Sequence, residues 1–400
     1  MLLAVTWKVF GVSIIVSHLM MLPFLILLIN QVYHFTRFYF KENWAYISAM
    51  ILFNPIILGQ STLISPDVVL IAFFFFTLNG ILYHKKVNII IGAIVLGGIS
   101  MRGMMCIPYL YLFSVLREKK TLKKALQNVV AFLPGVALVV LFLIFHYRYL
   151  GWIGYHKNSP WAESFERVGF QGFVRNIVVF GWRMVDMGLI FLWGILFVII
   201  LKNWSGFHLS KRTKDMSLLL LLCFFGSVLI QLFYRYSLLH RYLFPLISII
   251  ICIFGSITEE YTSEKSFKKI TVVAAIAFFS ANFWVFPDRI AKGWDATLAH
   301  LPYYKLRCET LNYIKQHNIP LNQISAAFPY DMERKYIDLR NDTSKFSALP
   351  PEETPYTLYS NIANQYSDDQ LLLLKTKFIP VYTFGGWPVR FILYKNPEYR

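Results

Sequence analysis

The chain has 400 residues, of which 56% are hydrophobic and only 15% are charged, with a mean hydropathy of +0.51. A soluble domain of this length cannot bury so much apolar surface, so the composition excludes an ordinary soluble protein and indicates lipid as the main solvent. The formal net charge of +17 would suit nucleic-acid binding, but lysine and arginine gather in short loops between apolar runs. This pattern follows the positive-inside rule, so we expect cytoplasmic basic loops, contact with membrane lipids and no nucleic-acid partner.

Apolar runs of about 20 residues predict helices that cross a hydrocarbon core about 30 Å thick. In chain order we expect about ten helices, near residues 11–33, 43–60, 67–83, 87–101, 104–116, 126–147, 176–201, 216–234, 240–257 and 270–287. The alternating basic loops then place on the outer face the segments 59–67, 100–103, 148–175 and 235–241, together with everything after residue 286. An even number of helices that ends outside also places the N-terminus outside.

The composition changes after Pro287, where the chain becomes polar. Strand-like runs (ISAAF, YTLYS, KFIPVY and RFILY) occur with two helix-like runs, and one of these, SDDQLLLLK, carries Ser367 and Gln370 at capping-box spacing. We therefore predict an all-α polytopic membrane domain over residues 1–287 and a small extracytoplasmic α/β domain over residues 288–400.

Asp67 opens the apolar run VVLIAFFFF, in which the four phenylalanines predict a lipid-facing helix. Ionisable side chains are costly at membrane depth, so this carboxylate is informative. Pro66 suits the first turn of a helix, and a carboxylate there interacts favourably with the helix dipole. Position alone therefore leaves two interpretations of Asp67, a helix-start signal or a functional carboxylate.

Arginines on the same predicted face support the functional interpretation. Arg102 lies in the next outer turn, and the run LLHRYLFPL begins another helix with a second arginine, although that arginine could also snorkel to the interface. A carboxylate with two guanidinium groups suits a site that deprotonates an acceptor and holds a phosphate or diphosphate. We therefore predict Asp67 as a catalytic residue. The residues predicted to bind substrate are Arg102, His240, Arg241 and Tyr242.

Two further features leave alternatives open. Arg183 and Asp186 lie three residues apart on the helix predicted over residues 176–201, and this spacing favours an intrahelical ion pair over a catalytic role. The outer segment 148–175 mixes aromatic residues with charges of both signs. It is either an interfacial amphipathic segment or a flexible cover over a lipid-linked substrate.

The order of these features resembles the GT-C membrane glycosyltransferases, specifically the group similar to protein mannosyltransferases and lipid A aminoarabinose transferases. FTRFYFKENWAYISAMILFNPIILGQSTLISPDVV resembles the family's basic turn, second helix and Pro-Asp motif, and HRYLFPL resembles its Arg-Tyr-Leu element. In GAIVLGGISMRGMM, Arg102 takes the position where the family has a lysine after a run of small residues. The resemblance covers roughly residues 1–260.

The resemblance implies an enzyme of the bacterial inner membrane that moves a sugar, with inversion, from a polyprenyl-phosphate donor to a lipid, glycan or protein acceptor on the outer face. Asp67 would match the second acidic residue of the family's site, near the donor phosphate or a metal, so a divalent metal cofactor is left open. The family's first helix and first outer loop would precede Met1, which leaves two alternatives: the natural start lies upstream, as we expect, or the chain is a truncated, inactive form.

Two other functions compete with this one, a lipid-linked sugar flippase or transporter and a non-catalytic envelope assembly protein. A transporter should carry ionisable groups near the bilayer midplane and inverted repeats. Here the informative charges lie at the outer rim, so the sequence favours the enzyme.

Overall fold

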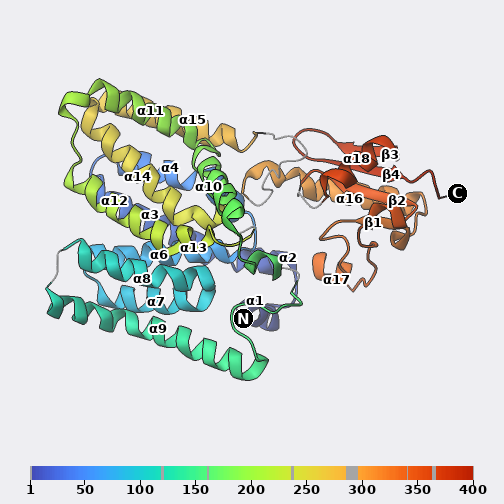
Figure 1. Ribbon diagram of the computed structural model, residues 1–400, viewed down its shortest axis with the longest axis horizontal. Helices are drawn as coiled ribbons and strands as arrows, with labels where there is room; N and C mark the ends of the chain where they lie inside the picture. The colour runs from blue at the N-terminus through green and yellow to red at the C-terminus, as the bar shows by residue number, and fades with distance from the viewer. Residues whose placement is uncertain are drawn as a thin grey trace. The chain divides into compact units, whose positions relative to one another are not determined.

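The computed structural model describes residues 2–118, 121–159, 162–235, 238–284, 296–339, 341–362 and 366–399, without the side chains of Leu122 and Lys124. These residues are mostly helical and end in a small sheet (Figure 1). They form two compact units. We call Pro23–Ser61 with Ser65–Ala281 the helical unit, and Met1–Leu22, Thr62–Ile64 and Asn282–Arg400 the C-terminal unit. The domain boundary predicted at residues 287 and 288 lies outside the described residues.

The sequence prediction of an all-α membrane part followed by a small α/β part is confirmed. The helices of the helical unit are α3 (Leu22–Tyr39), α4 (Trp44–Leu52), α5 (Pro55–Ser61), α6 (Pro66–Leu82), α7 (Lys86–Ile99), α8 (Met101–Leu116), α9 (Leu122–Leu150), α10 (Phe170–Val185), α11 (Leu189–Lys202), α12 (Lys211–Cys223), α13 (Leu229–Gln231), α14 (Phe244–Tyr261) and α15 (Glu264–Ala281). A π-helical turn, Phe224–Val228, joins α12 to α13.

Several helices are long and apolar enough to span a membrane, which makes the chain a multi-pass membrane protein. Within the described ranges four qualify by length and composition: Ile14–Tyr39, Ala125–Leu150, Lys211–Gln231 and His240–Tyr261. The pairs α5 with α6 and α10 with α11 raise the number to six if each bent pair is one span. α7 and α8 are shorter apolar helices.

The single helix predicted over residues 176–201 is wrong, because α10 and α11 meet at a bend of 79°. Met187 and Gly188 lie between them with φ values of +53° and +85°, a left-handed backbone that no α-helix can continue. The helix predicted over residues 43–60 is likewise two helices, since α4 ends before Pro55 and α5 begins with it. The residue before a proline avoids the α conformation, which explains this second break.

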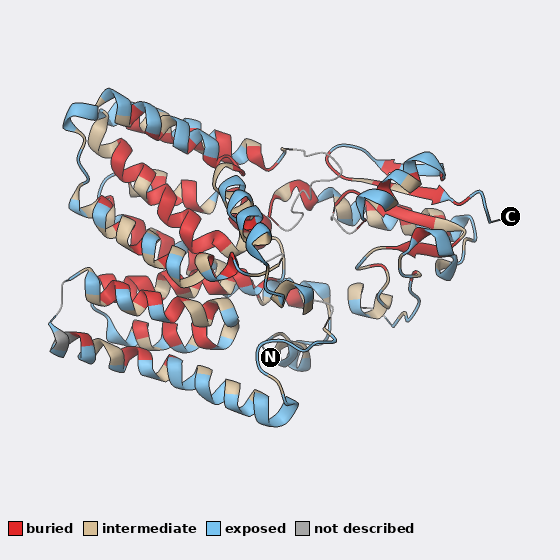
Figure 2. Ribbon diagram, in the orientation of Figure 1, coloured by how far each residue is buried: buried red, intermediate tan, exposed pale blue. Residues whose placement is uncertain are grey.

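The interpretation of the FFFF run as lipid-facing is wrong for its two central residues, whereas Phe73 and Phe76 are partly exposed. Phe74 and Phe75 are fully buried within the protein, as is most of α6. α14 is buried along most of its length too, whereas α9 is largely exposed and supplies a lipid-type surface (Figure 2). A helix that is apolar on all sides fits either lipid or a protein core, and only the packing decides between them.

The loops that carry many of the basic residues meet at one end of the helical unit, which we call the basic end. Arg117 at the end of α8 pairs with Asp215 of α12 at 3.0 Å, and His84 after α6 lies 3.7 Å from Glu118. A guanidinium nitrogen of Arg212 donates to the carbonyl of Tyr39 at the end of α3, at 2.9 Å. Because these basic loops meet at one end, the contacts agree with the prediction that basic loops alternate along the chain.

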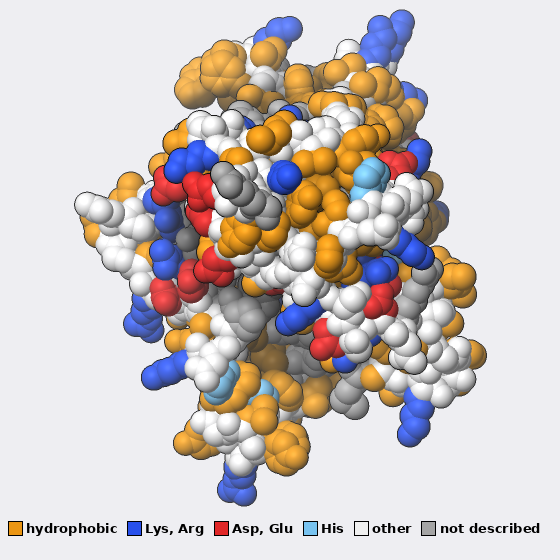
Figure 3. Space-filling model, turned by 90° about the vertical axis from the view of Figure 1, so that its right-hand side faces the viewer, with side chains coloured by type: hydrophobic (Ala, Val, Ile, Leu, Met, Phe, Trp, Pro, Cys, Tyr) orange, Lys and Arg blue, Asp and Glu red, His pale blue; other side chains and the backbone are white. Residues whose placement is uncertain are grey.

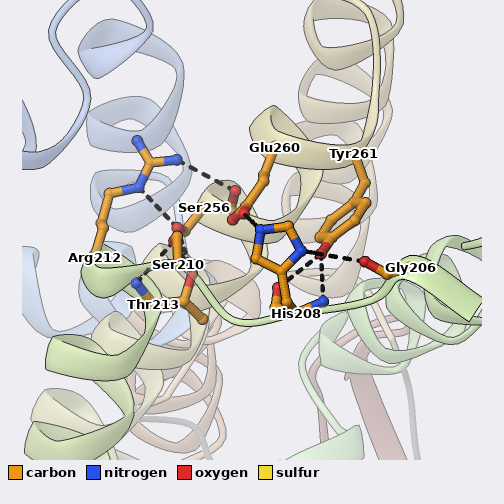
Figure 4. Close-up of polar contacts among 8 residues, drawn as sticks. All are labelled: Gly206, His208, Ser210, Arg212, Thr213, Ser256, Glu260 and Tyr261. Atoms are coloured by element: carbon orange, nitrogen blue, oxygen red, sulfur yellow. Dashed lines mark hydrogen bonds and ion pairs between the residues drawn. The ribbon is translucent and has the colours of Figure 1, made fainter. Parts of the chain in front are cut away.

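Arg212 anchors a partly buried polar network at the basic end (Figure 4). Its Nε donates to Ser256 Oγ at 2.7 Å, and its guanidinium forms an ion pair with Glu259 of α14. Ser256 Oγ is also 2.7 Å from Thr213 Oγ1. Arg212 therefore links α12 to α14. The loop pattern alone would instead imply a charge that faces lipid headgroups.

The C-terminal unit holds a four-stranded sheet in the order β1-β2-β4-β3. β1 (Ile324–Ala326) runs parallel to β2 (Tyr356–Ser360), while β4 (Arg390–Lys395) pairs antiparallel with both β2 and β3 (Ile379–Gly385). The four runs expected to be strands are thus confirmed. The helices of this unit are α1 (Leu2–Phe10), α2 (Ile14–Leu19), α16 (Pro302–Gln316), α17 (Arg334–Ile337) and α18 (Asp368–Thr376).

Helices cover both faces of this sheet. Leu306 of α16 shares one buried cluster with Phe391 of β4, whereas Leu374 of α18 shares the other with Tyr394 of the same strand. Alternate residues of a strand point to opposite faces, which places Phe391 and Tyr394 in different clusters. The predicted capping box at the start of α18 is present, with Ser367 Oγ accepting from the backbone N–H of Gln370 at 3.2 Å. The face shown in Figure 3 mixes charged side chains of both signs with apolar ones.

Candidate functional site

Asp67 lies at the start of α6 and is 2% exposed. α5 and α6 form an angle of 119°, and Ser65 caps α6 after this bend. Ser65 Oγ accepts from the backbone N–H of Asp67 at 3.1 Å and donates to Gln60 Oε1 at 2.5 Å. Pro66 takes the first turn, where its missing N–H costs no hydrogen bond. These local contacts fix the direction in which the Asp67 carboxylate leaves the helix.

Two arginines from distant parts of the chain meet this carboxylate. Arg102 in the first turn of α8 places Nη1 2.5 Å from Asp67 Oδ1. Arg241 belongs to a 3₁₀ turn, His240–Leu243, directly before α14, and its Nε lies 3.7 Å from Asp67 Oδ2. The turn between α7 and α8 depends on Gly103, because a Cβ there would lie 2.2 Å from the Leu96 carbonyl oxygen. The structure therefore brings together three residues that the sequence predicted to share one face.

Tyr242 lies against both arginines. The Cζ atom of Arg102 is 3.9 Å from the centre of the Tyr242 ring, and that of Arg241 is 5.4 Å away. Guanidinium groups stack favourably over aromatic faces at these distances. Tyr242 thus holds the Arg102 guanidinium in a defined orientation beside Asp67.

The charges of this cluster favour an anionic ligand. The Asp67 side chain is 3% exposed, whereas those of Arg102 and Arg241 are 25% and 30% exposed. The negative group is therefore enclosed and the positive groups are partly accessible. Arginine forks match the oxygens of a phosphate in geometry and charge, so the arrangement can bind a phosphate group.

His240 belongs to a second, neighbouring cluster. Its Nε2 lies 2.9 Å from Asp186 Oδ2 and 3.2 Å from Arg183 Nη1, and the ring is 5% exposed. The expected pair between Arg183 and Asp186 is present only at 4.0 Å, because Asp186 turns instead toward His240 and the backbone N–H of Met187. The sequence did not indicate the contact between Asp186 and His240. The two residues are 54 positions apart, and no local pattern links them.

The segment before α10 is attached to the chain just ahead of this turn. The backbone N–H of Arg235 donates to the Glu166 carbonyl at 3.0 Å, and its side chain lies 3.2 Å from the Glu166 carboxylate. Asn176 on α10 is buried and donates to the carbonyls of Leu232 and Tyr234, at 2.8 and 3.0 Å. α10 and the segment before it are thus held beside residues 232–235.

A metal ion would need several His, Cys, Asp or Glu side chains gathered around it. Among the described residues, no group of three or more His, Cys, Asp and Glu side chains is placed so that it could hold a metal ion. Asp67 stands with two arginines, and Asp186 with one histidine and one arginine. The chemistry that the described side chains show here is the pairing of carboxylates with cationic groups.

The helical bundle and the terminal α/β part define a GT-C-like fold. The chain is similar in structure to ArnT from Cupriavidus metallidurans, solved bound to undecaprenyl phosphate, with a TM-score of 0.51 and 11% identity. The similarity covers 98% of this chain and 86% of that one. At such low identity the likeness is one of fold. No protein-family model matches the chain, and no curated protein matches it.

Proposed function

We propose that this chain is a GT-C glycosyltransferase of the group similar to protein mannosyltransferases and lipid A aminoarabinose transferases. It transfers a sugar from a polyprenyl-phosphate donor to a lipid, glycan or protein acceptor on the outer face of a bacterial inner membrane. The observation that carries this proposal is the enclosed Asp67 carboxylate between two partly accessible guanidinium groups. The fold likeness to a protein solved with undecaprenyl phosphate supports a polyprenyl-linked donor.

Arg102 and Arg241 bind the donor phosphate in this proposal. When the bond between the sugar and the phosphate oxygen breaks, the electron pair stays on that oxygen, and negative charge grows on the departing polyprenyl phosphate. Guanidinium groups that are already in position stabilise this charge without reorganising. Tyr242 contributes by fixing the Arg102 guanidinium, 3.9 Å from its ring centre.

The sugar transfer requires the carboxylate of Asp67 in this proposal. An acceptor hydroxyl attacks the anomeric carbon from the side opposite the phosphate, which inverts that carbon, and its proton must go to a base. Asp67 serves as this base, or holds the two arginines at the phosphate by its ion pairs. Both roles require the negative charge and make its removal costly to turnover.

His240 supports the site in this proposal through Asp186. Its buried hydrogen bond ties the break between α10 and α11 to the turn that carries Arg241 and Tyr242. Residues 148–175, attached at Arg235, serve as the cover over the lipid-linked donor. Such a cover would exclude water, which otherwise competes with the acceptor for the sugar.

The experiment that tests the proposal uses the full chain in lipid nanodiscs, with polyprenyl-phosphate-linked pentoses and hexoses as donors and an envelope lipid extract as acceptor. A glycosyltransferase releases polyprenyl phosphate and forms a glycosylated acceptor. The same protein in sealed vesicles distinguishes a flippase, which moves the intact donor across the bilayer. Donor translocation without release of polyprenyl phosphate would overturn the proposal.

A further inference from the structure

A cavity of about 590 Å³ lies between α11 and α15, at the basic end of the helical unit. The two helices are close at their other end, where a Cβ on Gly188 would lie 2.9 Å from the Phe278 ring. They separate toward Lys202 and Ser263, and the cavity occupies the space between them. Its volume falls within the range of roughly 300–1,000 Å³ that is usual for ligand sites.

The lining of this cavity changes from apolar to polar along its length. Toward the middle of the helices it is formed by Gly194, Ile195, Val198, Ile199 and Ile270. Toward the basic end it is formed by Lys202, Asn203, Tyr261, Thr262, Ser263 and Ser266. Such a gradient matches a molecule with a polar head and an apolar tail, because each part of it meets side chains of its own kind.

The polar wall of the cavity is held in place by contacts with the loop before α12. Tyr261 Oη accepts from the backbone N–H of His208 at 2.6 Å and donates to its carbonyl at 2.7 Å (Figure 4). The Tyr261 ring also stacks on Phe207, with ring centres 5.1 Å apart. The wall is therefore preformed, which lowers the entropic cost of binding a ligand there.

The charge at the polar end is positive. Lys202 lines the cavity, and Lys269 lies three residues after Ser266 on α15, so it is a neighbour of the polar lining on the same helix. Among the residues that the structure describes, neither of these lysines forms an ion pair, whereas Lys268 is paired with Glu264. An anionic head therefore suits this end better than a neutral one.

We propose that this cavity binds an anionic diacyl phospholipid from the leaflet at the basic end. The phosphate lies beside Lys202 and Lys269, and the acyl chains run along Val198, Gly194 and Ile270 toward the bilayer centre. Anionic lipids bind basic pockets between membrane helices by this combination of charge and apolar contact. The proposal is independent of the glycosyltransferase function, because the cavity lies at the opposite end of α11 from Asp186 and His240.

Native mass spectrometry of the full chain in detergent tests this site, with phosphatidylglycerol and phosphatidylcholine of identical chains as probes. We expect one phosphatidylglycerol to bind at least roughly tenfold more tightly than phosphatidylcholine. Lys202→Glu should remove this preference. Gly194→Leu should weaken both lipids about tenfold or more by filling the apolar part. Gly194 tolerates a side chain, since an added Cβ there meets nothing within 4 Å.

Matched controls separate the site from general effects of charge and bulk. Lys86→Glu changes an exposed lysine at the start of α7, and Gly181→Leu adds bulk at another open glycine, on α10. Both should bind lipid as the parent does. Val198→Trp, at an exposed lining position, repeats the filling test if Gly194→Leu does not fold. Equal affinity for the two lipids in the parent, or filling variants that bind as tightly as the parent, would overturn the proposal.

Discussion

The Asp67 carboxylate is stabilised mainly by its ion pairs with Arg102 and Arg241, and only secondarily by its position at the start of a helix. A carboxylate at a helix N-terminus contributes about 0.3–1 kcal/mol through the dipole. Removing one partner of a buried, paired charge costs roughly 3–5 kcal/mol, because it leaves the other charge uncompensated. Asp67 is 2% exposed and its Oδ1 lies 2.5 Å from Arg102 Nη1. The larger cost, that of an uncompensated buried charge, therefore applies to Asp67. The helix-start role is real, with Ser65 and Pro66 in place, but it is the smaller of the two effects.

At the residue scale the sequence was informative where a polar group stood at the edge of an apolar run. Asp67, Arg102 and Arg241 could be grouped because alternating loops place them on one face, and the structure brings them into contact. The sequence could not show that His240 and Arg241 contact different clusters, since adjacent residues of a turn can point to different neighbours. Its pairing with Asp186 depends on the α10–α11 break, which the sequence pattern did not show.

Arg241→Ala should weaken equilibrium binding of polyprenyl phosphate about 10- to 100-fold, because it removes a charge-assisted contact worth roughly 1.5–3 kcal/mol. Arg241→Lys should recover only part of this loss, since an ammonium lacks the guanidinium fork. The measurement is a binding titration of the full chain in nanodiscs, and it needs no sugar or acceptor. Arg37→Ala, at an exposed arginine in the last turn of α3, is the control and should bind normally. If Arg241→Ala bound polyprenyl phosphate as tightly as the parent, Arg241 would not be a phosphate-binding residue.

At the element scale the existence of helices was predictable and their breaks were not. The apolar pattern of α10 continues into α11 in sequence, yet two left-handed residues turn the chain between them. The same pattern could not tell whether α6 faces lipid or protein, and the burial of Phe74 and Phe75 depends on helices packed from elsewhere in the chain. Hydrophobic periodicity reports which surface avoids water and not which partner covers it.

The break between α10 and α11 gives a prediction about stability. Gly188→Ala should lower the free energy of unfolding by roughly 1–3 kcal/mol, because φ is +85° and a Cβ would lie 2.9 Å from Phe278. Gly181→Ala is the matched control inside α10, where an added Cβ meets nothing within 4 Å. The control should be neutral or stabilising by about 0.5–1 kcal/mol. Thermal unfolding of both purified variants measures the difference, and equal stability would contradict the strained turn.

At the scale of the whole molecule the basic loops were the most useful signal. Contacts among Tyr39, Arg117, Arg212 and their partners gather those loops at one end of the helical unit. The grouping of the first 22 residues with the C-terminal residues was not predictable, because it depends on contacts distant in sequence. The capping box and four strand runs were predictable, since each is a local pattern.

The loop pattern also predicts the orientation of the protein. Alkaline phosphatase fused after Arg400 should be active and green fluorescent protein fused there should be dark, because the basic loops predict that residues 288–400 lie outside the cytoplasm. Fusions after Gly206, in the basic loop between α11 and α12, should give the reverse. Fluorescence without phosphatase activity after Arg400 would invert the membrane orientation and place the Asp67 site on the cytoplasmic face.

The most direct test of the glycosyltransferase site is the rate at which Asp67→Asn releases polyprenyl phosphate from a polyprenyl-phosphate-linked sugar. Asparagine keeps the shape of the side chain and removes its charge, so Arg102 and Arg241 still attract the donor. We expect donor binding to persist, while turnover falls about 100-fold or more because no carboxylate takes the proton or holds the arginines. The assay uses the full chain in nanodiscs with the lipid extract as acceptor. A folded Asp67→Asn protein that releases polyprenyl phosphate at the parent rate would contradict the catalytic role of Asp67.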